Sequence, residues 1–319
     1  MAIWSSPLND RPSLLDLLEV QKHFGLPSPA LVEKDWYVVK ALAAIIAVDA
    51  APFRFVFSGG TALSRAHRLI RRMSEDIDLK IIPDERLTRP ALRRLRDVIT
   101  QALLDAGFQF DPENPLHRES GNASRYTLYR LPYAPAATGA GTLRPEIQIE
   151  MAVWPLRRPA IELPVISFVA EAFNRPPEGA AIPCVALVET AAEKFVALTR
   201  RAGAELAAAG GPRDPTLVRH VYDLHMIRAQ YDVTEAALLA REIMVSDAAA
   251  YGHQFPAYRA NPVAETLRAV AGLVADPGFA ARHAAFQRDM VYGDRVAFDT
   301  AIAAVMELAT KIEVDENSP

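Results

Sequence analysis

One stretch of the chain constrains the fold more than any other, because it joins two strand patterns through a glycine turn and a helical pattern. An apolar β-type run from Phe53 to Phe57 ends at the pair Gly59-Gly60. The next dozen residues place apolar side chains at helical spacing, at Leu63, Ala66, Leu69 and Ile70. A second β-type run covers residues 76–82. The stretch therefore predicts strand, turn, helix and strand in succession, as in an α/β fold.

The second strand presents two acids on one of its faces. Asp76 and Asp78 are two positions apart, so they point to the same side, while the apolar residues between and after them point to the other. About 6.6 Å of strand separates the two acids, which lets them hold one or two divalent cations between them. Magnesium prefers hard oxygen ligands and is usually held by one or two carboxylates together with substrate phosphates. The glycine pair lets the backbone approach an anion closely, so these features together describe a metal–triphosphate site.

Composition limits the class of protein. The chain has 319 residues, of which half are hydrophobic and 23% are charged, which is sufficient for ordered globular domains. The single cysteine, Cys184, excludes an internal disulfide and a zinc site built on several cysteines, which fits a reducing cytoplasm. The sequence shows no secretory signal, and its longest apolar stretch, residues 41–48, is too short to cross a membrane. We therefore expect a cytoplasmic protein without a membrane partner.

The region after the glycine turn is locally basic, although the net charge of the chain is −4. Ten Lys or Arg stand against five Asp or Glu between Thr61 and Arg96, and two of those five acids are Asp76 and Asp78. Seven of the basic residues are arginines on the helix predicted after the turn and on a second helix predicted over 90–104: Arg65, Arg68, Arg71, Arg72, Arg93, Arg94 and Arg96. Such residues commonly form a solvated helix face. The alternative is a phosphate-binding track for a nucleic-acid acceptor.

Neither an isolated Asp-x-Asp nor an isolated Gly-Gly is specific, since the first is usually the solvated face of an edge strand and the second a turn. Their combination, with Gly-Gly closing one strand and Ser74-x-Asp76-x-Asp78 opening the next, resembles the signature of the nucleotidyltransferase superfamily. More narrowly, GGTALS followed by R.MSEDIDL is similar to the AbiEii-type nucleotidyltransferases, the toxins of bacterial toxin–antitoxin and abortive-infection systems. The fifteen residues between Gly60 and Asp76 exceed the spacing usual in the superfamily but suit this branch.

The resemblance implies an architecture and an activity. The expected fold is an α/β, polymerase-beta-like core with a small mixed sheet over residues 28–160, preceded by an arm and a helix over 1–27 and followed by a mainly helical domain over 161–319. The expected reaction moves a nucleoside monophosphate from an NTP to an acceptor and releases pyrophosphate, with Mg²⁺ or Mn²⁺ as cofactor. The resemblance, together with the arginines, indicates an RNA acceptor, specifically the 3′ end of tRNA. It also implies a cognate antitoxin as a further partner.

The resemblance also assigns roles to the acids. Asp76 and Asp78 would bind the metals, and a third acid would come from a neighbouring strand. The alternating pattern over 146–153 predicts such a strand, with its polar side chains on one face. By motif position the third ligand is Glu150, with Glu146 as the alternative. A surface strand with charged residues facing water would give the same pattern.

Further residues are expected to bind the nucleotide. Lys194, in an Ala-Glu-Lys-Phe context, would hold the triphosphate, and Asp223, in Arg-His-x-Tyr-Asp-Leu, would orient Lys194 or act near the acceptor. The alternative for these two is an exposed lysine and an ordinary charge pair on a helix. Lys34 and Asp35, on a helix that begins at Ser28-Pro29, would support the site or contact the nucleotide. The alternative is that they form, with Glu33, an ordinary charged helix face. The turn formed by Gly59, Gly60 and Thr61 would cradle the phosphates. Ser74 would position Asp76.

Other functions stay open. The same site would serve transfer to a protein or a small molecule, or a kinase-like phosphotransfer. A non-catalytic NTP- or RNA-binding module would be expected to have lost a carboxylate or the lysine, and this sequence has all of them. In the C-terminal half, the pattern predicts a flexible connection over 202–214 around Gly210-Gly211-Pro212, helix breaks at 251–256 and 291–294, and a frayed tail over 314–319.

Overall fold

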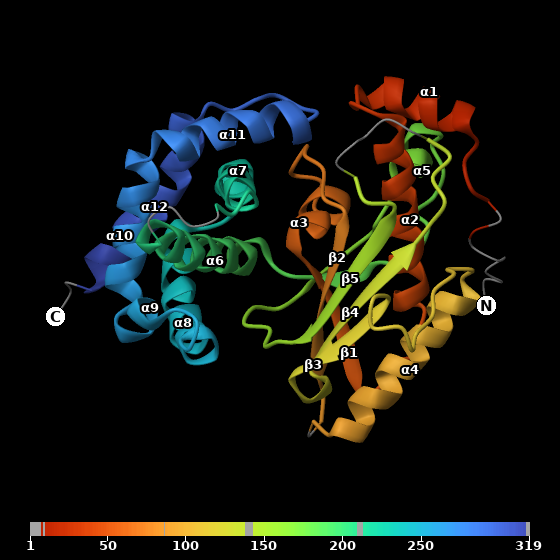
Figure 1. Cartoon of the computed structure of the whole chain (residues 1–319), viewed down its shortest axis with the longest axis horizontal. Helices are drawn as coiled ribbons and strands as arrows, with labels where there is room; N and C mark the ends of the chain where they lie inside the picture. The colour runs from red at the N-terminus through yellow and green to blue at the C-terminus, as the bar shows by residue number, and fades with distance from the viewer. Residues whose placement is uncertain (1–7, 9, 86, 138–142, 209–212, 317–319) are drawn as a thin grey trace. The chain divides into compact units, whose positions relative to one another are not determined.

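The computed structural model describes residues 8, 10–85, 87–137, 143–208 and 213–316, and the chain forms two compact units (Figure 1). The first unit comprises Met1–Arg68 and Met73–Val185, and the second comprises Leu69–Arg72 and Ala186–Pro319. The first unit extends to Val185, beyond the boundary at residue 160 that the sequence suggested, because the strands between these positions join its sheet.

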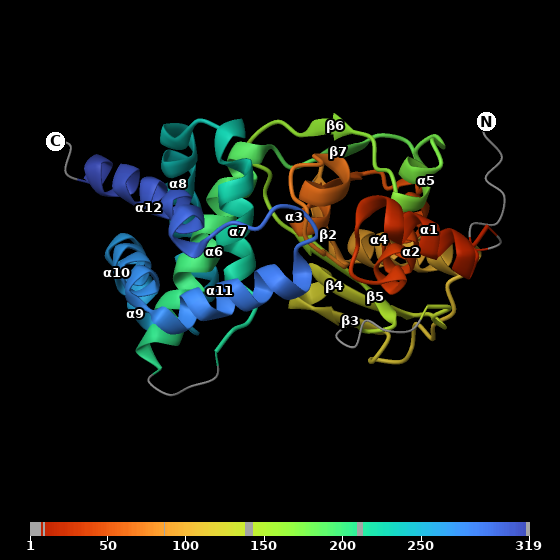
Figure 2. The ribbon, with the colours of Figure 1, turned by 90° about the horizontal axis from the view of Figure 1, so that it is seen from above.

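In the described residues, a seven-stranded mixed sheet with the order β3-β4-β5-β2-β1-β7-β6 forms the centre of the first unit. Figure 2 shows β3 and β4 at one edge of the sheet and β7 and β6 at the other. β2 runs parallel to β5 and β1 runs parallel to β7, while the other neighbouring strands are antiparallel. The fold is therefore α/β, as the sequence predicted, and the strands predicted over 53–57, 76–82 and 146–153 are confirmed. The strands are β1 (Phe53–Ser58), β2 (Asp76–Pro83), β3 (Arg118–Gly121), β4 (Tyr126–Pro132), β5 (Glu146–Val153), β6 (Ile161–Leu163) and β7 (Ile182–Cys184).

Helices of the first unit begin where the sequence provides caps. Ser28 accepts a hydrogen bond from the N–H of Ala30 and Pro29 occupies the first turn of α2, while Thr88 caps α4 in the same way. The helices are α1 (Leu14–Phe24), α2 (Pro29–Ile46), the single turn α3 (Gly59–Thr61) that continues as the π-helical η1 (Ala62–Ala66), α4 (Arg89–Asp105), the 3₁₀ turn η2 (Asn122–Ser124) and α5 (Phe168–Ala172).

The alternation of side chains gives the sheet one apolar and one acidic face. Ile77 of β2 and Ile149 of β5 are register partners, and both are fully buried. α4 packs on this apolar face, because the hydroxyl of Thr100 lies 2.8 Å from that of Tyr129 on β4, and Tyr129 is the register partner of Ile149. α2 contacts α4 and the same two strands, β2 and β5. The side chains of Asp78 and its neighbours at even spacing therefore lie on the opposite face.

The helix after the glycine turn is shorter than the sequence predicted. It ends at Ala66, and Arg68 adopts the left-handed region with φ of 58°. The following segment, Leu69–Arg72, is not helical and belongs to the second unit. The prediction that Leu69 and Ile70 continue the helix is therefore wrong, and so is the prediction that Arg68, Arg71 and Arg72 lie on it.

The second unit is helical in its described part. α6 contacts α7, α8 and α10, and α12 contacts the same three helices. The predicted breaks at 251–256 and 291–294 are confirmed, since they separate α8 from α9 and α11 from α12. The helices are α6 (Leu187–Ala207), α7 (Leu217–Ile227), the 3₁₀ turn η3 (Arg228–Gln230), α8 (Val233–Tyr251), α9 (Pro256–Ala260), α10 (Pro262–Ala275), α11 (Pro277–Met290) and α12 (Phe298–Glu316).

Two predicted irregular segments are partly helical. α6 continues through Ala207, so the flexible connection expected from residue 202 begins later, and Gly210-Gly211-Pro212 lies outside the described residues. α12 continues through Glu316, which shortens the expected tail, and residues 317–319 also lie outside the described part. Among the described residues, every helix is too short or too polar to span a lipid bilayer.

Candidate active site

The predicted metal ligands of β2 and β5 lie on the acidic face of the sheet. In the parallel register, Asp78 is the Cα partner of Glu150, and Asp76 is the partner of Gln148. Since neighbouring strands are about 4.8 Å apart, the backbones that carry Asp78 and Glu150 are adjacent. Burial and the nearby carboxylate of Asp76 raise the pKa of Glu150. The alternative ligand Glu146 lies four residues earlier on β5, where its carboxylate accepts a hydrogen bond from Gln148.

These acids suit a hard cation held jointly with a substrate. In the part of the chain that the structure describes, no three His, Cys, Asp or Glu side chains form a preassembled metal centre. Magnesium usually keeps several waters and takes its remaining ligands from one or two carboxylates and the substrate phosphates. The donor set offered here is carboxylate oxygen alone. Burial and, after it, the charge of Asp76 raise the pKa of Glu150, and a cation would offset both. The residues therefore fit Mg²⁺ or Mn²⁺.

Gly59 packs directly against Asp78. Its φ is +75°, in the left-handed region, and a Cβ built at this position would lie 1.8 Å from Oδ2 of Asp78. The hydroxyl of Ser58 donates to the carbonyl oxygen of Asp78 at 3.1 Å. The first glycine of the predicted turn is therefore required by both the backbone and the carboxylate, independently of any ligand.

Thr61 and Ser74 fix the beginning of β2. Thr61 is buried, and its hydroxyl lies 3.0 Å from that of Ser74 and donates to the carbonyl oxygen of Asp76. The hydrogen bonds of Ser74 therefore lead, through the Thr61 hydroxyl, to the backbone carbonyl of Asp76 and not to its carboxylate. The contact sets the position from which the Asp76 side chain leaves the strand.

The charged residues at the start of α2 are interior, which excludes a solvated helix face. The ammonium of Lys34 lies 2.6 Å from Oε2 of Glu75, the residue before Asp76. The carboxylate of Asp35 lies 3.2 Å from Nε of Arg65 and accepts a hydrogen bond from the N–H of Phe168. Burial raises the pKa of Asp35 to about 6. These contacts tie α2 to the residue before β2, to η1 and to α5.

In the second unit, Lys194 and Asp223 meet directly. Nζ of Lys194 on α6 lies 2.8 Å from Oδ2 of Asp223 on α7. Asp223 is fully buried, and Nε of Arg72 lies 2.6 Å from its other oxygen. Although burial opposes it, the charges of Arg72 and Lys194 hold the pKa of Asp223 well below its usual range. The signal that could have revealed Arg72 is Asp223 itself, since an acid in an apolar helix face needs a cation.

The seven arginines do not form one phosphate track. Arg65 and Arg72 are buried in ion pairs with Asp35 and Asp223, and Arg68 pairs with Glu171. Arg93 and Arg94 are exposed, but they lie on α4, which covers the apolar face of the sheet. Because Asp78 and Glu150 lie on the other face, closeness in the sequence does not bring the α4 arginines to the acids.

β4 contributes side chains to the acidic face that sequence reasoning missed. Leu128 is the register partner of Glu150, and Arg130 is the partner of Gln148. Tyr126 lies on the same face, and burial and the Glu150 carboxylate raise the pKa of its hydroxyl. A strand's period of two puts residues 126, 128 and 130 on one face, but polar Thr127 is on the buried face and apolar Leu128 on the other, so the sequence pattern does not identify the acidic face.

A family model described as "Nucleotidyl transferase AbiEii toxin, Type IV TA system" matches residues 40–304. The chain belongs to this family. It is therefore an enzyme, a nucleotidyltransferase toxin of the type IV toxin–antitoxin class, as the sequence resemblance indicated. The match includes all the predicted site residues from Gly59 to Asp223. No curated protein sequence matches the chain.

A similar solved structure is that of MenT4, a nucleotidyltransferase toxin from Mycobacterium tuberculosis H37Rv. The two chains share 18% identity, and the alignment covers 93% of this chain and 98% of that one with a TM-score of 0.49.

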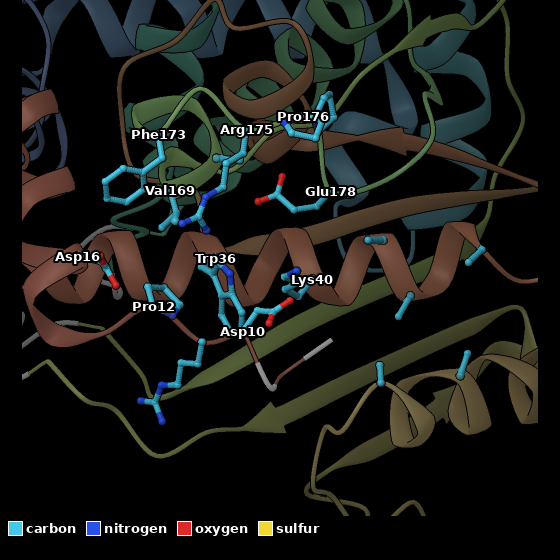
Figure 3. Close-up of a pocket in the computed structure, with 18 of the residues that line it drawn as sticks. Asp10, Pro12, Asp16, Trp36, Lys40, Val169, Phe173, Arg175, Pro176 and Glu178 are labelled. Carbon is cyan, nitrogen blue, oxygen red and sulfur yellow. The ribbon is translucent and has the colours of Figure 1, made fainter. Parts of the chain in front are cut away.

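A cavity of about 980 Å³ lies in another part of the first unit (Figure 3). Trp36 and Lys40 of α2, Val169 of α5, and Phe173 and Glu178 beyond it contribute to its wall. None of the predicted metal or nucleotide residues lines it. The acidic face therefore remains the candidate active site.

Proposed function

We propose that this enzyme moves a nucleoside monophosphate from an NTP to an RNA acceptor, the 3′ end of tRNA, and releases pyrophosphate. The observation that carries the proposal is the adjacent placement of Asp78 and Glu150 on parallel strands, with Asp76 on the same face. Gly59 keeps open the space that the Asp78 carboxylate occupies. Membership of the nucleotidyltransferase toxin family supports this chemistry at these acids.

Asp76, Asp78 and Glu150 would hold Mg²⁺ or Mn²⁺. When bound, the metal lowers the pKa of the attacking hydroxyl and neutralises charge on the triphosphate. In the transfer, the acceptor hydroxyl loses its proton to water and its oxygen bonds to the α-phosphorus. The bond from that phosphorus to the bridging oxygen breaks, so pyrophosphate leaves.

Lys194 would bind the triphosphate, and Asp223 would orient it. The support is the 2.8 Å contact between the two side chains, which fixes the end of a long and otherwise mobile side chain. A lysine ammonium is a compact charge that binds phosphate oxygens well. The Gly59–Thr61 turn would approach the phosphates with its backbone, while the Thr61 hydroxyl fixes β2.

The acidic face also offers groups suited to RNA. Tyr126 presents an aromatic ring, and Arg130 a guanidinium, on the strand next to Glu150. Single-stranded RNA is bound by stacking of bases on aromatic rings and by basic contacts to phosphates. A toxin of the type IV class also implies a cognate antitoxin, which we include as a partner of the system.

The test incubates the protein with total RNA and each of four labelled NTPs, with and without Mg²⁺ or Mn²⁺. We expect label to appear in tRNA only when metal is present, and the Asp78→Asn variant to produce none. Asp97→Asn is the matched control, since Asp97 is an exposed acid on α4, which covers the apolar face. Equal labelling by the wild type and Asp78→Asn would overturn the proposal.

The mass of the product separates the other reactions. Nucleotidyl transfer adds a nucleotide to the acceptor, whereas a kinase-like reaction adds only phosphate. Label in protein or in a small molecule instead of RNA would identify a different acceptor for the same site. NTP binding without any product would identify a non-catalytic module.

A further inference from the structure

The segment Leu69–Arg72 lies in the second unit, although the chain on both sides of it belongs to the first. The carbonyl oxygen of Arg71 accepts a hydrogen bond from the N–H of Tyr292 at 3.0 Å, and Arg72 forms an isolated antiparallel bridge with the residue before Tyr292. The N–H of Arg71 also donates to the hydroxyl of Tyr222 on α7, at 3.3 Å. Backbone contacts therefore fix the segment beside α7.

The position of this segment places the Arg72 side chain against Asp223. Nε of Arg72 donates to Oδ1 and Nη2 donates to Oδ2, each at 2.6 Å, so the guanidinium holds both carboxylate oxygens in a fork. Both side chains are buried. Oδ2 also receives the Lys194 ammonium at 2.8 Å. The plane of the carboxylate, and with it the direction of the Lys194 contact, is thus set by Arg72.

The charges of the three side chains sum to +1, from two cations and one carboxylate. Asp223 alone with Lys194 would form a neutral buried pair, which the ammonium would have to leave in order to bind another anion. Because Arg72 already engages both oxygens, the attraction between Asp223 and Lys194 is partly offset. Burial and the Lys194 charge lower the pKa of the neighbouring His220 to about 3, so His220 is neutral at pH 7 and does not change this sum.

We propose that Arg72 is a positioning residue that fixes the Asp223 carboxylate and leaves the Lys194 ammonium available to an anionic ligand, the triphosphate of the NTP. This inference rests on the proposed function, in which Lys194 binds the triphosphate. It assigns to Arg72 an electrostatic role in nucleotide use rather than contact with RNA. Arg72 precedes the Asp-x-Asp strand in the sequence, but its proposed role is to support Lys194 in the second unit.

The first test compares nucleotide kinetics of Arg72→Gln and Arg72→Lys. We expect Arg72→Gln to raise KM for the NTP by about tenfold, the scale of one charge-assisted hydrogen bond, with a smaller effect on kcat. Arg72→Lys restores the charge but not the fork, so it should recover part of the loss. The matched control is Arg200→Gln, which breaks a largely buried pair at another position, between Arg200 of α6 and Asp247 of α8 at 2.6 Å. Equal rises in KM in the Arg72 and Arg200 variants would indicate general destabilisation and overturn the proposal.

The second test follows Lys194 directly. An amine-reactive reagent and peptide mass spectrometry give the rate at which Lys194 is labelled, without any need for turnover. We expect Arg72→Gln to slow this labelling severalfold, because the ammonium is then held in a closed pair with Asp223, and Arg200→Gln to leave it unchanged. Labelling of Lys194 in Arg72→Gln at or above the wild-type rate would overturn the proposal.

Gly293→Ala provides a test if Arg72→Gln does not fold. A Cβ at Gly293 would lie 2.7 Å from Cδ and 2.8 Å from Cβ of Arg71, so the substitution displaces the segment without removing a charge. We expect KM to rise and Lys194 labelling to slow, less than in Arg72→Gln; no change in either would overturn the proposal. Lys194→Ala distinguishes a failure of the proposed role of Lys194 from a failure of the proposed role of Arg72. If it leaves KM for the NTP unchanged, the proposed role of Lys194 fails; if it raises KM but the Arg72 and Gly293 variants do not, only the role of Arg72 fails.

Discussion

The pKa values of Glu150 in the first unit and Asp223 in the second are shifted in opposite directions. On β2 and β5, Asp76, Asp78 and Glu150 share one face of a sheet, and the proximity of Asp76 contributes to a raised pKa at Glu150. On α7, Asp223 is buried between two cations, and its pKa is held well below the usual range. Like charges placed together cost stability, whereas a buried acid with two cations is part of the packing. The sheet acids thus suit a ligand, and Asp223 is a fixed part of its unit.

The largest expected effect is on activity, at the sheet acids. Asp76→Ala or Asp78→Ala should reduce nucleotidyl transfer by at least about 10³-fold, the upper range for loss of an electrostatic catalytic group. The thermal unfolding midpoint should stay the same or rise, because removal of mutually repelling acids seldom destabilises a protein. Labelled transfer assays and calorimetry measure the two outcomes, with Asp97→Asn as the control. Near-normal transfer in either variant would remove the metal hypothesis.

Asp223 should behave in the opposite way, with a large loss of stability. Asp223→Asn leaves the guanidinium of Arg72 and the ammonium of Lys194 buried without their shared carboxylate. Loss of one partner from a buried pair costs about 3–5 kcal/mol. Urea unfolding, followed by a probe in the second unit, measures this difference. A variant as stable as the wild type would show that the two cations can reach water, and the contrast with the sheet acids would fail.

Substitution of Lys194 should affect nucleotide use more than stability. Lys194→Ala should raise KM for the NTP by about tenfold to a hundredfold, as expected for a charge-assisted contact worth 1.5–3 kcal/mol. Lys194→Arg should rescue poorly, because a planar guanidinium differs in shape from an ammonium. Steady-state kinetics with varied NTP at saturating acceptor measures this. If KM is unchanged in Lys194→Ala, the lysine does not bind the triphosphate.

Lower pH should shift the stability of the two units in opposite directions. Burial lowers the pKa of His220 to about 3, so below pH 6.5 the unfolded state binds a proton that the native state does not. The free energy of unfolding should therefore fall by about 2 kcal/mol between high pH and pH 5. The pKa of Asp35 is raised to about 6, so the native state binds its proton first and gains about 1 kcal/mol between pH 7 and pH 5.

Hydrogen exchange, corrected for intrinsic rates, measures both shifts. Acidification should weaken protection of α7 and strengthen that of α2. His220→Gln should remove the first effect and Asp35→Asn the second. Parallel changes in both helices would show that the two groups do not dominate the pH response of their units.

The sequence predicted the parts of the fold that local alternation controls. β5 was located at 146–153 from its pattern alone, and the same pattern placed Glu150 on the face opposite to the buried residues. The segment Leu69–Arg72 was predicted incorrectly as helix, because its partners Val291 and Tyr292 lie more than two hundred positions later in the chain. Local spacing cannot anticipate such contacts. For the same reason the burial of Lys34 and Asp35, which depends on Glu75, Arg65 and Phe168, was not foreseen.

The smallest expected effect concerns the acceptor, and it contrasts the two faces of the sheet. RNA that reaches Asp78 and Glu150 should contact Arg130 on the acidic face, but not Arg93 and Arg94 on α4. The affinity of single-stranded nucleic acid falls with salt, with a slope of about −0.7 for each phosphate contact. Arg130→Gln should therefore flatten the salt dependence of tRNA modification by about that amount, without a change in NTP affinity.

The double variant Arg93→Gln with Arg94→Gln is the matched control, because it removes two exposed arginines from the layer that covers the apolar face. It should keep the wild-type slope when modification of tRNA is measured from low to moderate salt. A flatter slope in the α4 variant and an unchanged slope in Arg130→Gln would mean that RNA approaches along α4, and that the arginines of α4 form part of a phosphate-binding track. A reaction that does not depend on salt at all would exclude an extended RNA contact. The acceptor would then be a protein or a small molecule, and the acidic face would serve it with the same carboxylates.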